Sequence, residues 1–500
     1  KPSFTVAPIK GVAPLDVQLT DTSTGTVDTR LWDVLLDNGN GVLDAGDTLY
    51  RSVASQAAPL VAFDRGGDFH VRLTVSGPAG SFQLLREMAV RTVRADFRAL
   101  ATEGTISRAQ PTFTAQFFSD LAQGTIDGFF WDLDGDGAFE SSGVSPTFTY
   151  SAGGAYTVSL RVTTPFGVTQ TVTKPDFIVV HRAPIAGFSV SPDRGAAPLE
   201  VQLTDLSLGD DPRSFAWTVR NRATGLLLRW EKVGDVWVES AASVDTVTDR
   251  NPRLRFTSGG DYDITEAVTN AFGSDAATVE NAVRTILAQF QVNGSAGPIL
   301  TVVGRDVAFT DLSQGTVMAR AWDFGDDGGI SAQNPVHAYQ APGVYDVSLV
   351  VSGPAGSDDE VKPGLVTVLA PPVAFFTADV QRGNVTASPL VVHLSDRSSG
   401  LSANPAENAW DWQVYTDNGD GLFGPEDAFF QSSAVQNPTI SFPNGGDFHV
   451  RLVVTRNVPG LGPLASDPTV EEQYIRTIKV AFTATPTSGL IQPPPVGGLP

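Results

Sequence analysis

The chain has 500 residues, 41% of them hydrophobic, and its 55 acidic against 33 basic side chains give a net charge of −22. This length predicts several domains with buried cores, and the acidity excludes a nucleic-acid binder, because phosphate contacts need clustered Lys and Arg. No apolar run is long enough for a membrane span, and the lack of cysteine excludes disulfides, thiolate nucleophiles and zinc–thiolate sites.

One sequence pattern occurs five times along the chain. Each copy opens on a short strand, passes a turn containing Asp and Ser, reaches a Trp, enters a polar loop, and closes on a strand of alternating residues. The copies are marked by Trp32, Trp131, Trp217, Trp322 and Trp412. Their spacing of about 100 residues fits an immunoglobulin-sized sandwich of two sheets. No segment has a convincing helical period, so the predicted fold is all-β.

The predicted domains follow these copies and cover residues 1–94, 95–182, 183–287, 288–369 and 370–480. No Gly/Ser tether separates them, and prolines stiffen two of the joints. We therefore expect a semi-rigid rod, with a flexible chain of beads as the alternative. Residues 481–500 begin with AFTATP, which matches the FTVAP that opens the first copy at residues 4–8. They are expected to begin an incomplete sixth repeat in a longer parent chain, or to dock as a strand on a neighbouring molecule.

The third copy departs from the pattern. In place of an acidic loop it has residues 226–239, which predict an extra hairpin turning at residues 233–235. Its Trp230 and Trp237 either cover the sandwich or form a contact surface for a partner. The closing strand places Glu266 on the inward face, where other copies have Leu. Because a buried unpaired carboxylate is costly, we expect a bulge, a polar partner or a wet patch under the hairpin.

The fourth copy has the most regular motifs. They are WDFGD at residues 322–326, NPVHAY at 334–339 and GVYDVSLVV at 343–351. This copy resembles the PKD (polycystic kidney disease) domain family, which reads W-D-F-G-D-G, N-P-x-H-x-Y and G-x-Y-x-V-x-L-x-V. The second copy keeps the motif as WDLDGDG at residues 131–137, the first and fifth keep the frame with longer loops, and the third is the most divergent. The resemblance implies a tandem array of five immunoglobulin-like (PKD) β-sandwiches. Such modules are common in extracellular and cell-surface proteins as spacers, adhesion units and enzyme accessories.

The acidic loops after the Trp residues are the candidate metal sites. Clustered carboxylates and amides beside Gly suit Ca²⁺, which takes six to eight oxygen ligands in flexible geometry. A solvated hairpin turn explains the same residues, because Asp, Asn and Gly are also common turn formers. The fourth copy is a poorer candidate, and no metal is expected in the third. The predicted ligands are Asp37, Asn40, Asp44 and Asp47 in the first copy, Asp132, Asp134, Asp136 and Glu140 in the second, and Asp417, Asp420, Glu426 and Asp427 in the fifth.

No catalytic site is expected. His70 and His449 occupy the same repeat position and are predicted to be exposed on the outer face of a sheet, whereas His337 is predicted to be a satisfied, semi-buried histidine. The chain has no G-x-S-x-G elbow, phosphate loop or H-E-x-x-H motif. Its acids lie in repeated turns instead of the cleft that glycoside hydrolysis needs.

Three classes of function fit these observations. The first is a non-catalytic extracellular structural or adhesive protein, such as a stalk, surface array or filament subunit built from calcium-stabilised repeats. The second is a carbohydrate- or surface-binding accessory region of a larger secreted enzyme, for which Phe429 and Phe430 are candidate aromatic contacts. The third is another non-catalytic part of a secreted hydrolase. Expected partners are other copies of the chain, cell-surface proteins or polysaccharides, and the expected location is extracellular, secreted or at the cell surface.

Overall fold

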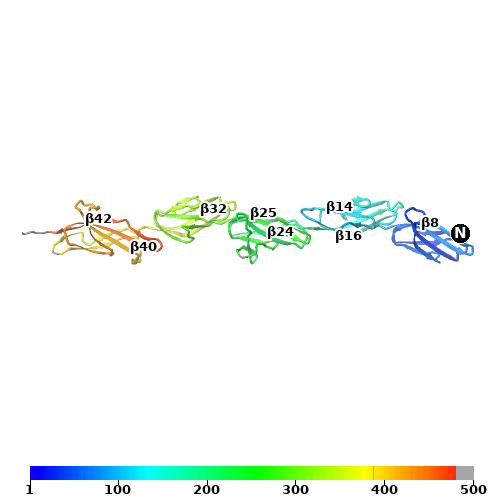
Figure 1. Cartoon of the computed structure of the whole chain (residues 1–500), viewed down its shortest axis with the longest axis horizontal. Coiled ribbons are helices and arrows are strands. Elements are labelled where there is room, and N and C mark those ends of the chain that lie inside the picture. The colour runs from blue at the N-terminus through cyan, green and yellow to red at the C-terminus, as the bar shows by residue number, and fades with distance from the viewer. Residues whose placement is uncertain (242, 387, 480–500) are drawn as a thin grey trace, which may run out of the picture. The chain divides into compact units, whose positions relative to one another are not determined.

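The computed structural model describes residues 1–479 except 242 and 387. Strands and loops make up these residues, and the helical element among them is a single 3-10 turn at Pro405–Glu407 (Figure 1). They belong to two compact units: one holds Lys1–Asp193, Glu200–Thr257 and Asp261–Val283, and the other holds Arg194–Leu199, Ser258–Gly260 and the chain from Arg284 onward. The predicted all-β array of immunoglobulin-like sandwiches is confirmed. The segment 481–500, with its expected sixth repeat or docking strand, lies outside the described residues.

Residues 1–182 form two pairs of sheets. The first pair contains β1 (Phe4–Ala7), β3 (Leu15–Asp21) and β6 (Leu60–Phe63), and, in the larger sheet, β2 (Lys10–Val12), β8 (Gly80–Val93), β7 (Gly67–Gly77), β4 (Thr29–Leu36) and β5 (Thr48–Ala54). The second pair contains β14 (Thr147–Tyr150), β11 (Phe113–Phe118) and β9 (Arg98–Ala99), and β10 (Glu103–Ile106), β16 (Thr169–Arg182), β15 (Gly154–Thr163), β12 (Gly128–Asp132) and β13 (Ser141–Ser142). Each pair encloses its own apolar core.

The remaining described residues repeat this arrangement. The strands of residues 183–287 are β17 (Phe188–Ser191), β19 (Leu199–Asp205), β23 (Arg253–Phe256), β22 (Val236–Glu239) and β21 (Trp230–Val233), and β18 (Arg194–Ala196), β25 (Gly273–Ile286), β24 (Gly260–Asn270) and β20 (Ser214–Asn221). Those of residues 288–369 are β26 (Phe290–Val292), β28 (Asp306–Asp311) and β31 (Val336–Ala338), and β27 (Ile299–Val302), β33 (Gly356–Leu369), β32 (Gly343–Gly353), β29 (Ala319–Asp323) and β30 (Gly329–Ile330). Those beyond are β34 (Phe376–Ala378), β36 (Leu390–Asp396) and β39 (Thr439–Phe442), and β35 (Arg382–Val385), β42 (Thr469–Lys479), β40 (Gly446–Val458), β37 (Asn408–Thr416) and β38 (Ala428–Ser433), with β41 (Gly462–Ala465) beside β40.

The opening segment of each pair contributes to both sheets. Its first part, such as β1, pairs antiparallel in one sheet, and its second part, such as β2, runs parallel to the last strand of the other. The same switch occurs in the later repeats. One continuous segment therefore ties the two sheets of each sandwich together.

A Phe–Trp contact lies at the centre of each sandwich. The Phe comes from the opening segment and makes a T-shaped contact with a Trp that is at most 3% exposed, with ring centroids 5.1 to 5.4 Å apart. Such T-shaped aromatic pairs add about 0.5–1.5 kcal/mol to the effect of burial. The pairs are Phe4–Trp32, Phe97–Trp131, Phe188–Trp217, Phe290–Trp322 and Phe376–Trp412.

The extra hairpin of the third repeat is present as β21 and β22, with Gly234 in its turn at φ +62°. It lengthens one sheet, because β22 runs parallel to β23. Trp230 is fully buried and packs edge-on against Phe256, while Trp237 is half-buried and donates its indole N–H to Asp249. Of the two interpretations, the one in which these Trp residues cover the sandwich fits this packing.

Glu266 has a polar partner, as predicted. Its side chain is fully buried beside Trp217, and Oε2 accepts hydrogen bonds from the Ser207 hydroxyl at 3.1 Å and the Gly187 amide at 3.2 Å. Burial raises the pKa of Glu266 to about 7, and the negative charge of Asp205 adds to the increase. Since the folded-state pKa lies above the unfolded value, the folded state binds this proton more tightly.

The stability of the third sandwich should therefore fall as the pH rises from about 4.5 to about 7. Replacing Glu266 with Gln should raise the unfolding free energy of the third sandwich by about 2–3 kcal/mol at pH 8. At pH 4 the same substitution should change this free energy little. Hydrogen exchange in urea, corrected for intrinsic rates and resolved to peptides of β20 and β24, measures the unfolding free energy of this sandwich separately from the other repeats. Glu280→Gln, at an exposed ion pair on β25, is the control. Equal effects of Glu266→Gln at both pH values would contradict the assignment.

Candidate metal sites

The acidic loop of the first repeat folds over a buried histidine. His70 is fully buried, and its Nδ1 accepts the backbone N–H of Met88 at 3.1 Å. The neutral ring therefore carries its proton on Nε2, which lies 3.2 Å from Asp37 Oδ1 and 3.6 Å from Asp47 Oδ2. The imidazole N–H thus points between the two carboxylates that close the loop.

The fifth repeat has the same arrangement. His449 is fully buried, its Nδ1 accepts the backbone N–H of Gln473 at 3.1 Å, and its Nε2 lies 3.6 Å from Asp417 Oδ1 and 3.7 Å from Asp427 Oδ2. The prediction that both histidines are exposed is wrong. Strand alternation places them on the outer face of the sheet, but the acidic loop folds back and covers that face.

A bulge explains why a histidine stands at this position. Met88 and Gln473 have φ of 47° and 46°, and the register of the closing strands shifts beside each of them. The bulge amide needs an acceptor on the opposite strand. In the third and fourth repeats that acceptor is a carboxylate, Asp263 for Asn281 and Asp346 for Gly364. Each imidazole accepts a hydrogen bond from the bulge amide. In the first repeat His70 also donates a hydrogen bond to Asp37 in the acidic loop, which a carboxylate could not do.

The loop carboxylates of these two repeats already accept hydrogen bonds from the loop. In the fifth repeat Gln473 Nε2 lies 2.8 Å from Asp417, and this donor, followed by the amides of the loop, lowers the pKa of Asp417 to about 2. In the first repeat the bonds run from Gly39 and Gly41 to Asp37, from Asn40 and Gly46 to Asp44, and from Asn38 and Asp44 to Asp47.

The second repeat has a different acidic loop. Asp132, Asp134, Asp136 and Glu140 offer carboxylate oxygens that all lie within 4.8 Å of one another. Burial raises the pKa of Glu140, and the charges of Asp134 and Asp132 raise it further. A cation among these oxygens would relieve that repulsion, so the donor set fits Ca²⁺. In the first and fifth repeats the third converging group is an N–H donor, which fits a cation less well.

The structure therefore brings together the whole predicted ligand set of the second repeat and part of the sets of the first and fifth. Asp37 with Asp47, and Asp417 with Asp427, converge on a histidine, while Asp44, Asp420 and Glu426 lie outside these groups. Asn40 donates its side-chain N–H to Asp44. Sequence reasoning missed His70, His449 and two glutamates, Glu87 and Glu472, that accept loop amides. The available signal was that His follows Gly-Gly-Asp-Phe in the two repeats with the long D-N-G loop.

The fourth repeat uses its acid differently. His337 is partly buried, stacks on Phe324 at 4.2 Å, and places Nε2 2.8 Å from Asp326 Oδ2. The predicted satisfied, semi-buried histidine is confirmed. Asp326, one of the acids of this poorer candidate site, is therefore hydrogen-bonded to the His337 ring.

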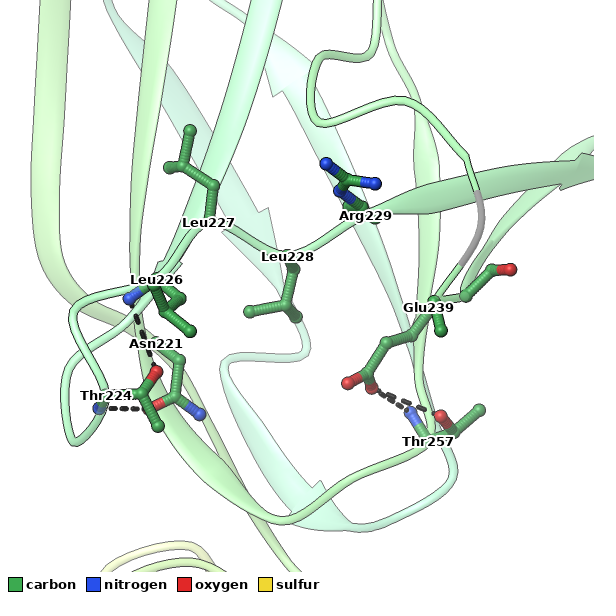
Figure 2. A pocket seen from close by; sticks show the side chains of 10 residues that line it. Asn221, Thr224, Leu226, Leu227, Leu228, Arg229, Glu239 and Thr257 are labelled. Carbon is green, nitrogen blue, oxygen red and sulfur yellow. Dashed lines mark hydrogen bonds between the residues drawn. The ribbon is translucent and has the colours of Figure 1, made fainter.

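A surface pocket of about 450 Å³ lies beside the hairpin of the third repeat (Figure 2). Two of its polar side chains accept hydrogen bonds from neighbouring backbone N–H groups: Glu239 from Thr257, and Asn221 from Thr224. Leu226, 69% exposed, lines it as well. Of the candidate aromatic contacts elsewhere, Phe429 is 59% exposed, whereas Phe430 stacks on Phe442.

The PKD domain family model matches residues 98–180 and 298–368. These two segments are PKD domains. The resemblance is thereby confirmed. No curated protein sequence matches the chain.

Several solved structures are similar at low identity. Three N-terminal domains of the highly immunogenic outer capsid protein of bacteriophage RB49 are 13% identical, covering 60% of this chain and 100% of that one, with a TM-score of 0.29. An I-band fragment of titin is 14% identical over 55% of this chain and 98% of its own, with a TM-score of 0.30. Immunoglobulin domains 1–5 of Sidekick-1 are 11% identical over 96% and 99%, with a TM-score of 0.19.

The buried histidine gives a testable stability difference. Replacing His70 with Ala leaves the Met88 amide without its acceptor and removes the donor between Asp37 and Asp47, so the first repeat should lose about 2–4 kcal/mol of unfolding free energy. His393→Ala is the matched control, because His393 also pairs with an aspartate, Asp379, but is 61% exposed. An exposed pair is worth about 0–1 kcal/mol. Hydrogen exchange resolved to peptides and measured across a denaturant titration gives the unfolding free energy of the repeat that carries each substitution. Equal losses of unfolding free energy for His70→Ala and His393→Ala would contradict the structural role of His70.

Proposed function

We propose that this chain is a non-catalytic structural or adhesive part of an extracellular protein, such as a stalk, surface array or filament subunit. Tandem PKD-type domains are consistent with such a module. Among the described residues, no helix is long and apolar enough to cross a membrane. The partners we propose are further copies of the chain, cell-surface proteins or polysaccharides.

The joint between the first two repeats is the observation that carries this proposal. The Gly66 amide donates to Gln123 Oε1 at 3.2 Å, and the Thr125 hydroxyl donates to Asp68 at 2.6 Å. A Cβ atom on Gly124 would lie 2.4 Å from the Thr92 carbonyl oxygen. Such direct contact restricts motion between neighbours, which suits a spacer or stalk and is not required of independent binding domains.

The state of the titratable groups supports a non-catalytic role. The carboxylates of the first loop accept hydrogen bonds within their own turn, and His70 points into it. His337 and His393 each pair with one aspartate. General acid–base chemistry needs such groups directed at a bound substrate.

An accessory carbohydrate- or surface-binding region of a larger secreted enzyme is the second candidate. The exposed Phe429 and the pocket beside the third-repeat hairpin favour it. Glycan-array binding by the whole chain, lost on Phe429→Ala, would support this candidate over the first.

The array proposal predicts elongated particles. Five sandwiches of about 35 Å placed end to end would span on the order of 150–200 Å in electron micrographs. Gly124→Val should shorten and broaden the length distribution, because its side chain meets the Thr92 carbonyl. Gly143→Val is the control: Gly143 has a similar φ, +96° against +99°, but no atom within 4 Å of the added Cβ. Compact wild-type particles, or identical distributions for the two variants, would contradict the proposal.

We further propose that Ca²⁺ stabilises the acidic loops, most strongly in the second repeat. Millimolar Ca²⁺ should raise the melting temperature of that repeat relative to chelator, by the amount that affinity and concentration set. Asp134→Asn with Asp136→Asn should abolish the increase there. The first and fifth loops, where a histidine N–H enters the cluster, should respond less. An unchanged melting curve with and without chelator would contradict calcium binding.

A further inference from the structure

The contact set of the first joint recurs later in the chain. The Gly259 amide donates to Gln314 Oε1 at 3.2 Å, as Gly66 does to Gln123. A Cβ on Gly259 would lie 2.3 Å from the Gln314 carbonyl oxygen, and one on Gly315 would lie 2.3 Å from the Thr285 carbonyl oxygen. The second and fourth repeats each supply a Gln-Gly-Thr loop, residues 123–125 and 314–316.

The opposite half of both joints also has a common sequence. The last strand ends in Arg-Thr and an aliphatic residue, at 91–93 and 284–286. The Thr92 and Thr285 hydroxyls each donate at 2.7 Å to the carbonyl of the residue before the Gly-Gly turn. Val93 and Ile286 are fully buried and belong to the core of the repeat that follows. The aliphatic residue therefore seals the neighbour's core.

The other two joints are built differently. A Cβ on Gly209 would lie 3.0 Å from Pro184 Cα, and one on Gly400 would lie 3.1 Å from Pro372 Cα. No Gln precedes Gly209 or Gly400. The two kinds of joint alternate along the chain, so the first and third repeats present the Arg-Thr end, and the second and fourth present the Gln-Gly-Thr loop.

The fifth repeat carries the Arg-Thr end again. Its closing strand ends in Arg476, Thr477 and Ile478, and the Thr477 hydroxyl donates at 2.8 Å to Asn444, immediately before Gly445 and Gly446. Ile478, however, is 64% exposed, whereas its counterparts Val93 and Ile286 are fully buried.

A depression of about 540 Å³ lies on this surface, lined by Asp447, Thr477, Ile478 and four neighbouring residues. The corresponding residues of the first repeat contact the second repeat. Lys10 donates to the Phe166 carbonyl, Arg91 lies over the Phe166 ring, and Asp68 accepts from Thr125.

We propose that this surface, hereafter the socket (Gly445, Gly446, Asp447, Arg476, Thr477 and Ile478), docks a further β-sandwich repeat that carries a Gln-Gly-Thr loop. The loops at 123–125 and 314–316 are engaged within the chain, so the occupant brings a loop of its own. Its Gln accepts the Gly445 amide and its core covers Ile478. This goes beyond the structural role proposed above, because it names the kind of repeat that this surface binds.

Grafting tests the socket within the whole chain. Residues 96–182, or in a second protein residues 289–369, replace residues 481–500, so that a Gln-Gly-Thr repeat follows the fifth. The control graft, residues 187–287, supplies a repeat without that loop. Hydrogen exchange of peptides covering 443–448 and 475–479 should slow at least about tenfold with either Gln-Gly-Thr graft and little with the control. In the unmodified chain, the peptide covering 64–69 should already exchange slowly.

A Gln→Ala substitution in the grafted loop should restore fast exchange at Gly445 while the grafted core stays protected. Unchanged exchange at the socket with both Gln-Gly-Thr grafts would overturn the proposal, as would equal protection by the control graft. A Gln-Gly-Thr graft that fails to fold beside a folded control would also count against it, because the first and third repeats seat such repeats.

Discussion

The contact between one Phe and one Trp, repeated in every sandwich, is the interaction on which the rest of the structure depends. The Phe lies on the opening segment, which belongs to both sheets, and in the first repeat the Trp lies on β4, between β7 and β5 of the larger sheet. Their packing holds the sheets together and aligns the closing strand, so that Trp32 stands opposite Leu73. Glu266 occupies the same place opposite Trp217 and titrates abnormally because the core surrounds it.

The bulge in the closing strands links this framework to the acidic loops. The backbone amide of the bulge requires an acceptor on the opposite strand. The residue that supplies this acceptor determines whether the acidic loop also receives a hydrogen-bond donor. A carboxylate, as at Asp346, accepts the hydrogen bond from the bulge amide but has no N–H to offer the loop. A histidine, as at His70, satisfies the amide and presents an N–H to two loop carboxylates. Where neither stands over the loop, in the second repeat, four carboxylates are left to converge, and these are the best match to a cation.

The joints between repeats are also built from a few recurring residues. Glycine is needed at Gly66 and Gly124 because backbone atoms of the two neighbours lie where a Cβ would stand. The threonine hydroxyl then holds the Gly-Gly turn in place, and an aliphatic residue closes the next core. Because the two kinds of joint alternate, each repeat meets its neighbours through one of two distinct sets of contacts.

The amino-acid sequence by itself determined the repeat, the all-β class, the inward position of Glu266 and the third-repeat hairpin, because these follow from local period, turn residues and motif spacing. Tertiary structure alone decided that His70 is buried, which acids converge, and how Gln123 meets Gly66. His70 and Asp37 are 33 residues apart, and Gly66 and Gln123 are 57 apart. Strand alternation specifies which face a side chain takes but not what folds over that face, so contacts closed by a returning loop or a neighbouring repeat are settled only when the whole chain packs.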